Sequence, residues 1–313
     1  MAPEQGQSDS LLTVLVALGA NLLIAGAKSF AAAITASASM TAEAAHSWAD
    51  TGNELLLVVA SRRAARPPDR AHPLGHGREA YVWSLFAAVG LFVAGGVVSI
   101  IRGVDELRAP TPAEDFVVGY VVLGISFLLE GVSFLRSVRQ ASPAAEALDR
   151  DLIEHVMATS DPLLRAVFAE DFAALIGLVL AAAGLGAHQL TGSAVPDAVG
   201  SILIGVLLVA VAFVLINSNR RFLVGEEADP RIRAAVLRAL LSLPEVARVT
   251  YLRLEVVGPR MVSVVGDVDL SGDDAESHVA VRLRALEAKI SASPAVAGAV
   301  LSLSAPDEPT LTA

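Results

Sequence analysis

A histidine and an aspartate lie four residues apart in an otherwise apolar stretch, at His46 and Asp50. Residues at this spacing stand one above the other on a helix face, so the imidazole and the carboxylate can converge on one point. An ionisable group at membrane depth costs roughly 2.5 to 3.5 kcal/mol, which makes a functional role the default reading. The pair therefore predicts a metal-binding position. The alternative is a helix end whose side chains reach the lipid headgroups.

Two consecutive acids, Glu170 and Asp171, begin another apolar run. If this run packs against the helix of His46 and Asp50, Asp171 supplies a third ligand. One nitrogen and two carboxylates suit Zn²⁺, and also Mn²⁺, Fe²⁺ or Co²⁺. A tetrahedral site needs a fourth donor, and Glu170 points about 100° away from Asp171 on an ideal helix. The open candidates are water, Asn53, or Glu170 on a rotated or irregular helix.

A different cluster, Asp69, His72 and His76, lies in a segment rich in proline and glycine. Such a segment prevents a regular helix and lets three donors curl round one ion. By spacing alone, a solvated turn that caps the following helix is an equal alternative.

Four further polar residues lie in or beside apolar runs. Asn21, Lys28 and Glu130 could be buried partners of the sites above, or could form interhelical hydrogen bonds and snorkel. Asp197 is expected to cap the last apolar segment at its far end, with a second role at an ion exit as the alternative.

The elements that position these residues are apolar. Of 313 residues, 54% are hydrophobic and mean hydropathy is +0.60, which is typical of a polytopic membrane protein. Each of six segments is long enough for the roughly 20 residues that cross a bilayer. They are Leu11 to Ala33, Met40 to Ala60, Ala80 to Ile101, Phe116 to Val138, Ala166 to His188, and Val195 to Ile216.

Charge and cysteine content narrow the function. Arginine is dense at 61–78, 136–165 and 220–221, so the positive-inside rule places those loops and both termini in the cytoplasm. A net charge of -10 argues against a nucleic-acid partner. The chain has no cysteine, which excludes disulfides and thiolate metal sites.

After Phe222 the composition becomes that of a water-soluble region. Amphipathic and alternating patterns predict a helix over 230–243, strands near 252–256 and 261–270, a helix over 273–290 and a strand over 296–303. The expected fold is an all-α six-helix transmembrane domain with a small ferredoxin-like αββαβ domain. The expected division is a cytoplasmic tail over 1–10, a six-span transmembrane domain over 11–222 and a cytoplasmic domain over 223–313, whose size suits dimerisation or sensing.

Several separated motifs resemble, in order, those of the cation diffusion facilitator family. Residues 21–57 resemble its first two spans, residues 72–78 (HPLGHGR) resemble its first cytoplasmic loop, and residues 197–205 resemble its sixth span. Ser160-Asp161-Pro162, followed by the acids at 170–171, resembles the branch that includes human zinc transporter 9.

The resemblance implies a site with two donors from span two and two from span five. His46, Asp50 and Asp171 match three of these positions, whereas the fourth position is Val167, which cannot bind metal. Glu170 is therefore a possible substitute.

The resemblance also implies a further zinc ion in the cytoplasmic loop, at Asp69, His72 and His76. The tail of bacterial relatives carries a His-rich binuclear site. This tail has only His278, so a metal-sensing site of that form is not expected.

The implied activity is secondary transport rather than enzymatic catalysis. We expect proton-coupled efflux of a divalent metal, foremost Zn²⁺, by a homodimer in a bacterial plasma membrane, with no prosthetic group. A regulatory, non-transporting member with an incomplete site is the alternative, favoured by Val167. A metal-dependent hydrolase is a remote third possibility, and no hydrolase motif supports it.

Overall fold

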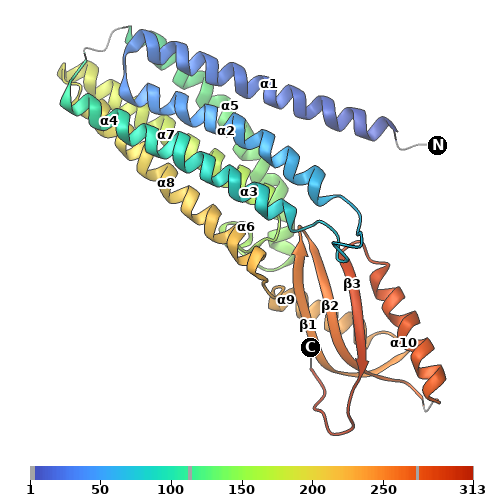
Figure 1. The fold of residues 1–313 in the computed structure, drawn as a ribbon. Coiled ribbons are helices and arrows are strands. Elements are labelled where there is room, and N and C mark those ends of the chain that lie inside the picture. Colours follow the sequence, from blue (N-terminus) through green and yellow to red (C-terminus); the bar gives the residue numbers. More distant parts are fainter. Residues whose placement is uncertain (1–3, 112–114, 273–274, 313) are drawn as a thin grey trace. The chain divides into compact units, whose positions relative to one another are not determined.

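The computed structural model describes residues 4–111, 115–272 and 275–312, with side chains from residue 18 onward (Figure 1). Each predicted apolar segment lies within one longer helical stretch. Of the expected tail, residues 1–3 lie outside the described residues, and residues 4–10 continue the first helix. The stretches are α1 (Glu4–Thr35), α2 (Ala38–Ala64), α3 to α4 (Glu79–Arg108), α5 (Phe116–Ala147), α7 (Pro162–Thr191) and α8 (Val195–Val224).

Five of these stretches are long and apolar enough to cross a bilayer, which makes the chain a multi-pass integral membrane protein. Among the described residues, α2 is the one of the six stretches that is not apolar enough to count as a candidate span. Its sequence includes Glu43, His46, Asp50 and Glu54, so its mean hydropathy is low. The second predicted segment is therefore a helix with buried polar side chains, among them Glu43, His46 and Asn53.

The third predicted segment is one continuous stretch with a change of helix type. The α-helices α3 (Glu79–Gly90) and α4 (Val98–Arg108) flank a π-helical segment over Leu91–Val97, which the sequence did not suggest. Glycines bring this stretch close to α8. A Cβ at Gly103 would lie 2.6 Å from the carbonyl oxygen of Ala198, and one at Gly205 would lie 2.8 Å from that of Gly96. Small residues allow such close helix packing in membranes.

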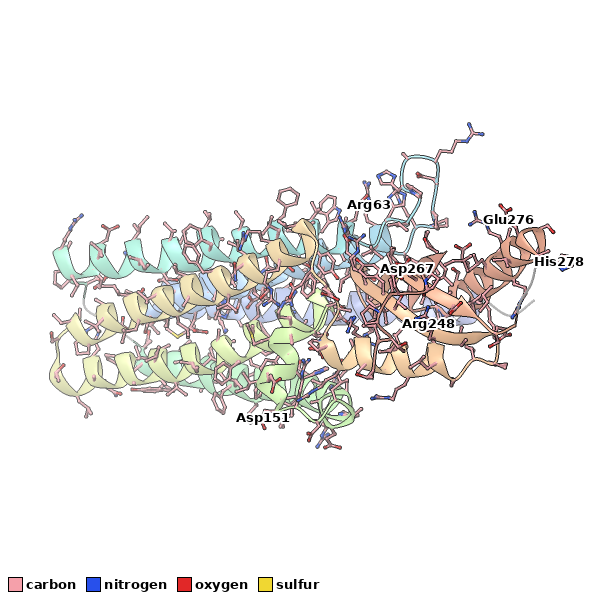
Figure 2. The ribbon with its side chains drawn as sticks, turned by 90° about the horizontal axis from the view of Figure 1, so that it is seen from below. Arg63, Asp151, Arg248, Asp267, Glu276 and His278 are labelled. Carbon is pink, nitrogen blue, oxygen red and sulfur yellow. The ribbon has the colours of Figure 1, made fainter. Side chains whose placement is uncertain are left out.

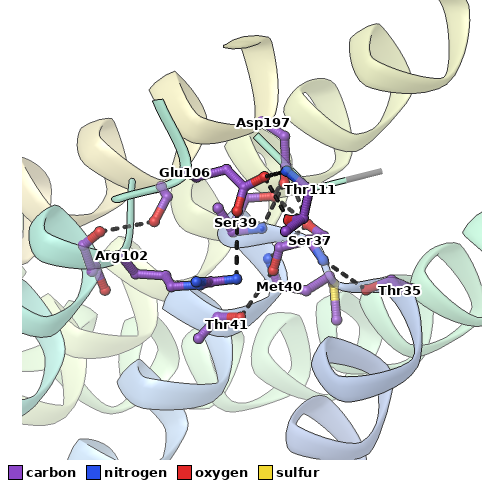
Figure 3. Close-up of polar contacts among 12 residues, drawn as sticks. Thr35, Ser37, Ser39, Met40, Thr41, Arg102, Glu106, Thr111 and Asp197 are labelled. Atoms are coloured by element: carbon purple, nitrogen blue, oxygen red, sulfur yellow. Dashed lines mark hydrogen bonds and ion pairs between the residues drawn. The ribbon is translucent and has the colours of Figure 1, made fainter. Parts of the chain in front are cut away.

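Asp197 joins the start of α8 to the turn between α1 and α2 (Figure 3). Its Oδ2 accepts a hydrogen bond from the backbone amide of Ala38 at 2.6 Å. Its Oδ1 accepts hydrogen bonds from Ser37 Oγ at 2.9 Å and from Ser39 Oγ. Asp197 therefore satisfies free donors at the N-terminus of α2, in addition to lying at the start of its own helix.

The chain divides into two compact units. The first contains the residues up to Val59, Trp83–Met157 and Leu163–Ser218. The second contains Ala60–Val82, Ala158–Pro162 and the residues from Asn219. The loop of Asp69, His72 and His76 therefore belongs to the same compact unit as the C-terminal region.

The second unit contains a three-stranded mixed sheet (Figure 1). β1 (Val246–Gly258) pairs antiparallel with β2 (Met261–Leu270), and β2 pairs parallel with β3 (Val296–Leu303). The helices α9 (Pro230–Leu241) and α10 (Glu276–Ser291) share its apolar core. The core includes Leu237, Leu240, Val249, Leu252, Leu254, Val264, Val268, Leu286 and Leu301.

Local sequence explains these elements. Asp229 accepts a hydrogen bond from the amide of Arg231 at 2.9 Å and caps α9, with Pro230 in the first turn. The order helix, strand, strand, helix, strand agrees with the prediction. The predicted start of the second helix, residues 273–274, lies outside the described residues. A short helix, α6 (Leu152–Ala158), was not foreseen.

Two loops of the second unit attach to its sheet. A Cβ at Gly77 would lie 2.6 Å from the carbonyl oxygen of Val257, so only glycine fits that approach. Near the turn between β1 and β2, the amide of Arg260 donates to Ser160 Oγ at 3.0 Å, and its guanidinium lies 3.1 Å from Asp161 Oδ2. The motif Ser160-Asp161-Pro162 therefore has a structural role in this unit.

Candidate metal centres

His46 and Asp50 face each other on α2, as the spacing predicted. His46 Nδ1 lies 3.3 Å from Asp50 Oδ1, and the imidazole is fully buried. Both imidazole nitrogens and Asp50 Oδ1 are buried without a hydrogen-bond partner in the described structure. Buried polar atoms are normally paired, so three unsatisfied atoms at one point indicate a position built for a ligand. Nitrogen and carboxylate oxygen together suit a divalent cation.

The two acids at the start of the α7 apolar run turn to different neighbours. Glu170 Oε1 accepts a hydrogen bond from Asn53 Nδ2 on α2 at 3.0 Å. Asp171 Oδ2 instead accepts from two serines of α5, Ser133 Oγ at 2.8 Å and Ser137 Oγ at 3.4 Å. The sequence led us to expect Asp171 beside the α2 pair. In this structure Glu170 is the acid that reaches α2, because adjacent residues project about 100° apart.

In the described structure, His46 and Asp50 do not form a group of three ligands with any other histidine, aspartate or glutamate. Among the described residues, a single group of three has ligand atoms that all lie within 4.8 Å of one another, and it is the loop group. The charges that act on Asp50 are the carboxylates of Glu170, Glu130 and Asp171 and the ammonium of Lys28. The α7 acids are thus close enough to influence the pair without completing a coordination shell.

Glu43 and two serines of α5 also contribute to this region and were not predicted from the sequence. Lys28 Nζ on α1 lies 3.0 Å from Glu43 Oε2 on α2, and both side chains are fully buried. Glu43 precedes His46 by three residues, so helical spacing upstream of the pair was a usable signal. The serines Ser133 and Ser137 are four apart on α5, which was a weaker signal.

The loop residues form a compact cluster. Asp69 Oδ1 lies 3.2 Å from His72 Nδ1, and Asp69 Oδ2 lies 3.1 Å from His76 Nε2. The two imidazole rings are 4.1 Å apart at their centroids. Asp69 and His72 are exposed, whereas His76 is buried. Three donors at this separation can hold one ion with an open position for water.

Backbone hydrogen bonds fix the Asp69 carboxylate. Its Oδ1 accepts from the amides of His72 at 2.7 Å and Ala71 at 2.8 Å. The backbone hydrogen bond from His72, followed by the side-chain hydrogen bond from His76, lowers the pKa of Asp69 to about 2. Asp69 is therefore ionised at neutral pH, as a metal ligand must be.

The C-terminal region has few potential metal ligands close to one another in its described part. Its one histidine, His278, is exposed near the start of α10 beside Glu276 (Figure 2). No group of three potential ligands occurs in the described part of that region. Arg248, also in Figure 2, instead forms an ion pair with Asp269 at 2.9 Å.

These observations define a polytopic membrane protein with potential metal ligands on its helices and on one loop. The cation efflux transmembrane domain matches residues 14–224, and the chain belongs to this family of transporters. It is accordingly a member of a transporter family and not of an enzyme family.

Individual relatives are also metal transport or metal tolerance proteins by name. Metal tolerance protein C4 of Arabidopsis thaliana is 35% identical over 86% of this chain and 59% of its own length. A mitochondrial proton-coupled zinc antiporter of Xenopus laevis is 35% identical over 83% of this chain and 46% of its own length. A manganese efflux system protein of Bacillus subtilis is 23% identical over 81% of each chain. This chain thus spans about half the length of the first two relatives.

Proposed function

We propose that this protein exports a divalent transition metal, foremost Zn²⁺, from the cytoplasm in exchange for protons. The observation that carries the proposal is the fully buried imidazole of His46 beside Asp50, with neither of its nitrogens in a hydrogen bond in the described structure. A zinc antiporter and a manganese efflux protein among the relatives support this substrate class.

Proton exchange follows from competition for the same atoms. A metal ion needs the imidazole neutral and the carboxylate ionised, so protonation and metal binding exclude each other. Metal would load from the cytoplasm, helix rocking would expose the site outward, and protons would displace the ion.

The proposed membrane ligands are His46 and Asp50 from α2 with an acid from α7. Glu170 is the first choice, because its carboxylate already contacts α2 through Asn53. Asp171 remains a candidate and would have to leave its serine partners on α5. An oxygen-rich set of this kind accepts Mn²⁺, Fe²⁺ or Co²⁺ as well as Zn²⁺. The loop cluster of Asp69, His72 and His76 would hold a further ion.

We further propose six spans, with α2 as the polar one, and both termini in the cytoplasm of a cell whose plasma membrane holds the protein. The arginine-rich loops support this orientation. The proposed division places a transmembrane domain over 11–222 and a ferredoxin-like dimerisation domain over 223–313. Apolar residues on the exposed sheet face, such as Tyr251 and Val300, support a homodimer.

The test is metal uptake into proteoliposomes under an imposed proton gradient, with Zn²⁺, Mn²⁺, Fe²⁺ and Co²⁺ each tried. Gradient-dependent uptake by the parent, lost in Asp50→Ala, would support antiport and identify the metal. Lys289→Ala is a matched control, because Lys289 forms an exposed ion pair with Glu245 on the C-terminal region.

A specific observation favours a second candidate function. Val167, in the family position of the fourth ligand, has no metal-binding atom, as a non-transporting regulatory member would tolerate. The same assay separates the two functions. If folded parent protein moves none of the four ions, the transport proposal is wrong and the regulatory one takes its place.

A further inference from the structure

An ammonium group lies fully buried at membrane depth in this protein. Lys28 is 0% exposed, and its Nζ lies 3.0 Å from Glu43 Oε2, which is also 0% exposed. A lysine that snorkels would place its charge at the membrane surface. Lys28 instead keeps its charge inside the helix bundle, where such a charge is expensive unless it is paired.

The fold makes room for the acid of this pair. A Cβ at Gly177 on α7 would collide with Glu43 Oε1, so any larger residue there would displace the carboxylate. Glu43 Oε1 has no hydrogen-bond partner in the described structure. Lys28 is thus the partner that holds the Glu43 carboxylate at the junction of α1, α2 and α7.

The charge of Lys28 acts beyond its partner. It is attracted by Glu130 and Asp50 as well as by Glu43. It also acts on His46, where a positive neighbour disfavours a second positive charge. Both residues of the proposed α2 metal pair therefore lie within the field of this one ammonium group.

We propose that Lys28 is an internal countercharge that weakens divalent-metal binding at His46 and Asp50, and that Glu43 limits this effect by pairing with it. This inference rests on the proposed transport function. With the site empty, Lys28 offsets the negative charge of the surrounding carboxylates. When a dication arrives, Lys28 repels it, so the ion is held loosely enough to leave.

The physical reason is that a transport site must bind its ion and also release it. Carboxylates from α5 and α7 act on Asp50 and would otherwise hold a dication tightly in a poorly hydrated interior. A fixed positive charge lowers that affinity without occupying a ligand position. Lys28 is thus a positioning and affinity-setting residue, not a ligand.

The experiment measures the half-saturating Zn²⁺ concentration and the maximal rate of uptake into proteoliposomes for the parent and four variants. Lys28→Met should lower half-saturation on the order of tenfold and reduce the maximal rate, because release slows. Glu43→Gln should raise the half-saturating Zn²⁺ concentration by a similar factor, because the Lys28 charge is then no longer offset by the Glu43 carboxylate. Lys28→Met/Glu43→Gln should lie between the single variants, and Lys28→Arg should not show the tenfold decrease.

The opposite signs separate this proposal from a structural role. A pair that only stabilised the fold would give less folded protein in both single variants, without a lower half-saturation in Lys28→Met. Unchanged or raised half-saturation in Lys28→Met would overturn the inference alone, provided that the parent transports Zn²⁺. If Lys28→Met does not fold, the comparison of Glu43→Gln with the double variant tests the inference instead. Equal half-saturating Zn²⁺ concentrations in those two variants would overturn the inference. Absence of parental transport would overturn both proposals.

Discussion

The buried carboxylate of Glu170 accepts a hydrogen bond from the side-chain amide of Asn53, with a donor–acceptor distance of 3.0 Å. This bond joins α7 to α2 one turn beyond Asp50. The neighbouring acid, Asp171, is held by Ser133 on α5. Two consecutive residues of one helix therefore bind to two different helices, Glu170 to α2 and Asp171 to α5. Of the two acids, Glu170 is thus the one that faces the helix of His46 and Asp50.

We predict that Glu170→Gln impairs metal binding more than Asp171→Asn does. Glu170→Gln should raise the half-saturating Zn²⁺ concentration on the order of a hundredfold, since it removes the acid that faces α2. Asn53→Ala should raise it on the order of tenfold, because a hydrogen bond to a charged acceptor contributes about 1.5–3 kcal/mol. Uptake kinetics in proteoliposomes measure both. A larger loss in Asp171→Asn would instead assign Asp171 as the ligand.

The second prediction concerns acid titration of the loop cluster. Asp69 has its pKa lowered to about 2 by the His72 backbone amide first and then by His76, so its carboxyl should titrate near pH 2 by NMR. The ordinary aspartate pKa is about 3.9. A lowered folded-state pKa stabilises the fold above pH about 4, and that contribution is lost as pH falls toward 2.

Between pH 7 and 5, Asp69 therefore stays ionised and remains available as a metal ligand. Isothermal titration of the full chain should show the loop's binding step abolished in Asp69→Ala. A titration midpoint for Asp69 near 4 would contradict the hydrogen-bonded geometry of the loop.

The third prediction concerns backbone contact between the loop and the sheet. Gly77→Ala should lower the free energy of unfolding of this region by about 1–3 kcal/mol, because its Cβ would meet the backbone of Val257 and Gly258. Gly26→Ala is the matched control, since nothing lies within 4 Å of a Cβ there. It should be neutral or slightly stabilising, as a helical alanine is. Thermal unfolding in detergent compares the two variants.

The fourth prediction concerns the cap on α2. Asp197→Ala should destabilise the transmembrane unit by about 2 kcal/mol or more, because it removes the acceptor of the Ala38 amide and of two serine hydroxyls. Asp197→Asn should cost less, because its amide oxygen still accepts from Ala38. Thermal unfolding of the two purified variants checks this order. Equal losses would mean that the charge matters and the hydrogen bonds do not.

The hydropathy and helical spacing of the sequence were sufficient to predict most of the helices and strands and one pair of site residues. Every apolar segment lies inside a helix, and the strands over 261–270 and 296–303 have the predicted bounds. The pair at His46 and Asp50 followed from a spacing of four residues on one helix. These features are local, because they depend on the periodicity of one element and on turn residues beside it.

The features that depend on two or more helices needed the tertiary structure. Sequence spacing showed that Glu170 and Asp171 project in different directions, but not which of them faces α2. Only packing showed that Lys28 pairs with Glu43, and that Asp197 caps a helix other than its own. The helical rotation of α7 and the partner of each buried charge are set by neighbouring helices, which lie far apart in sequence.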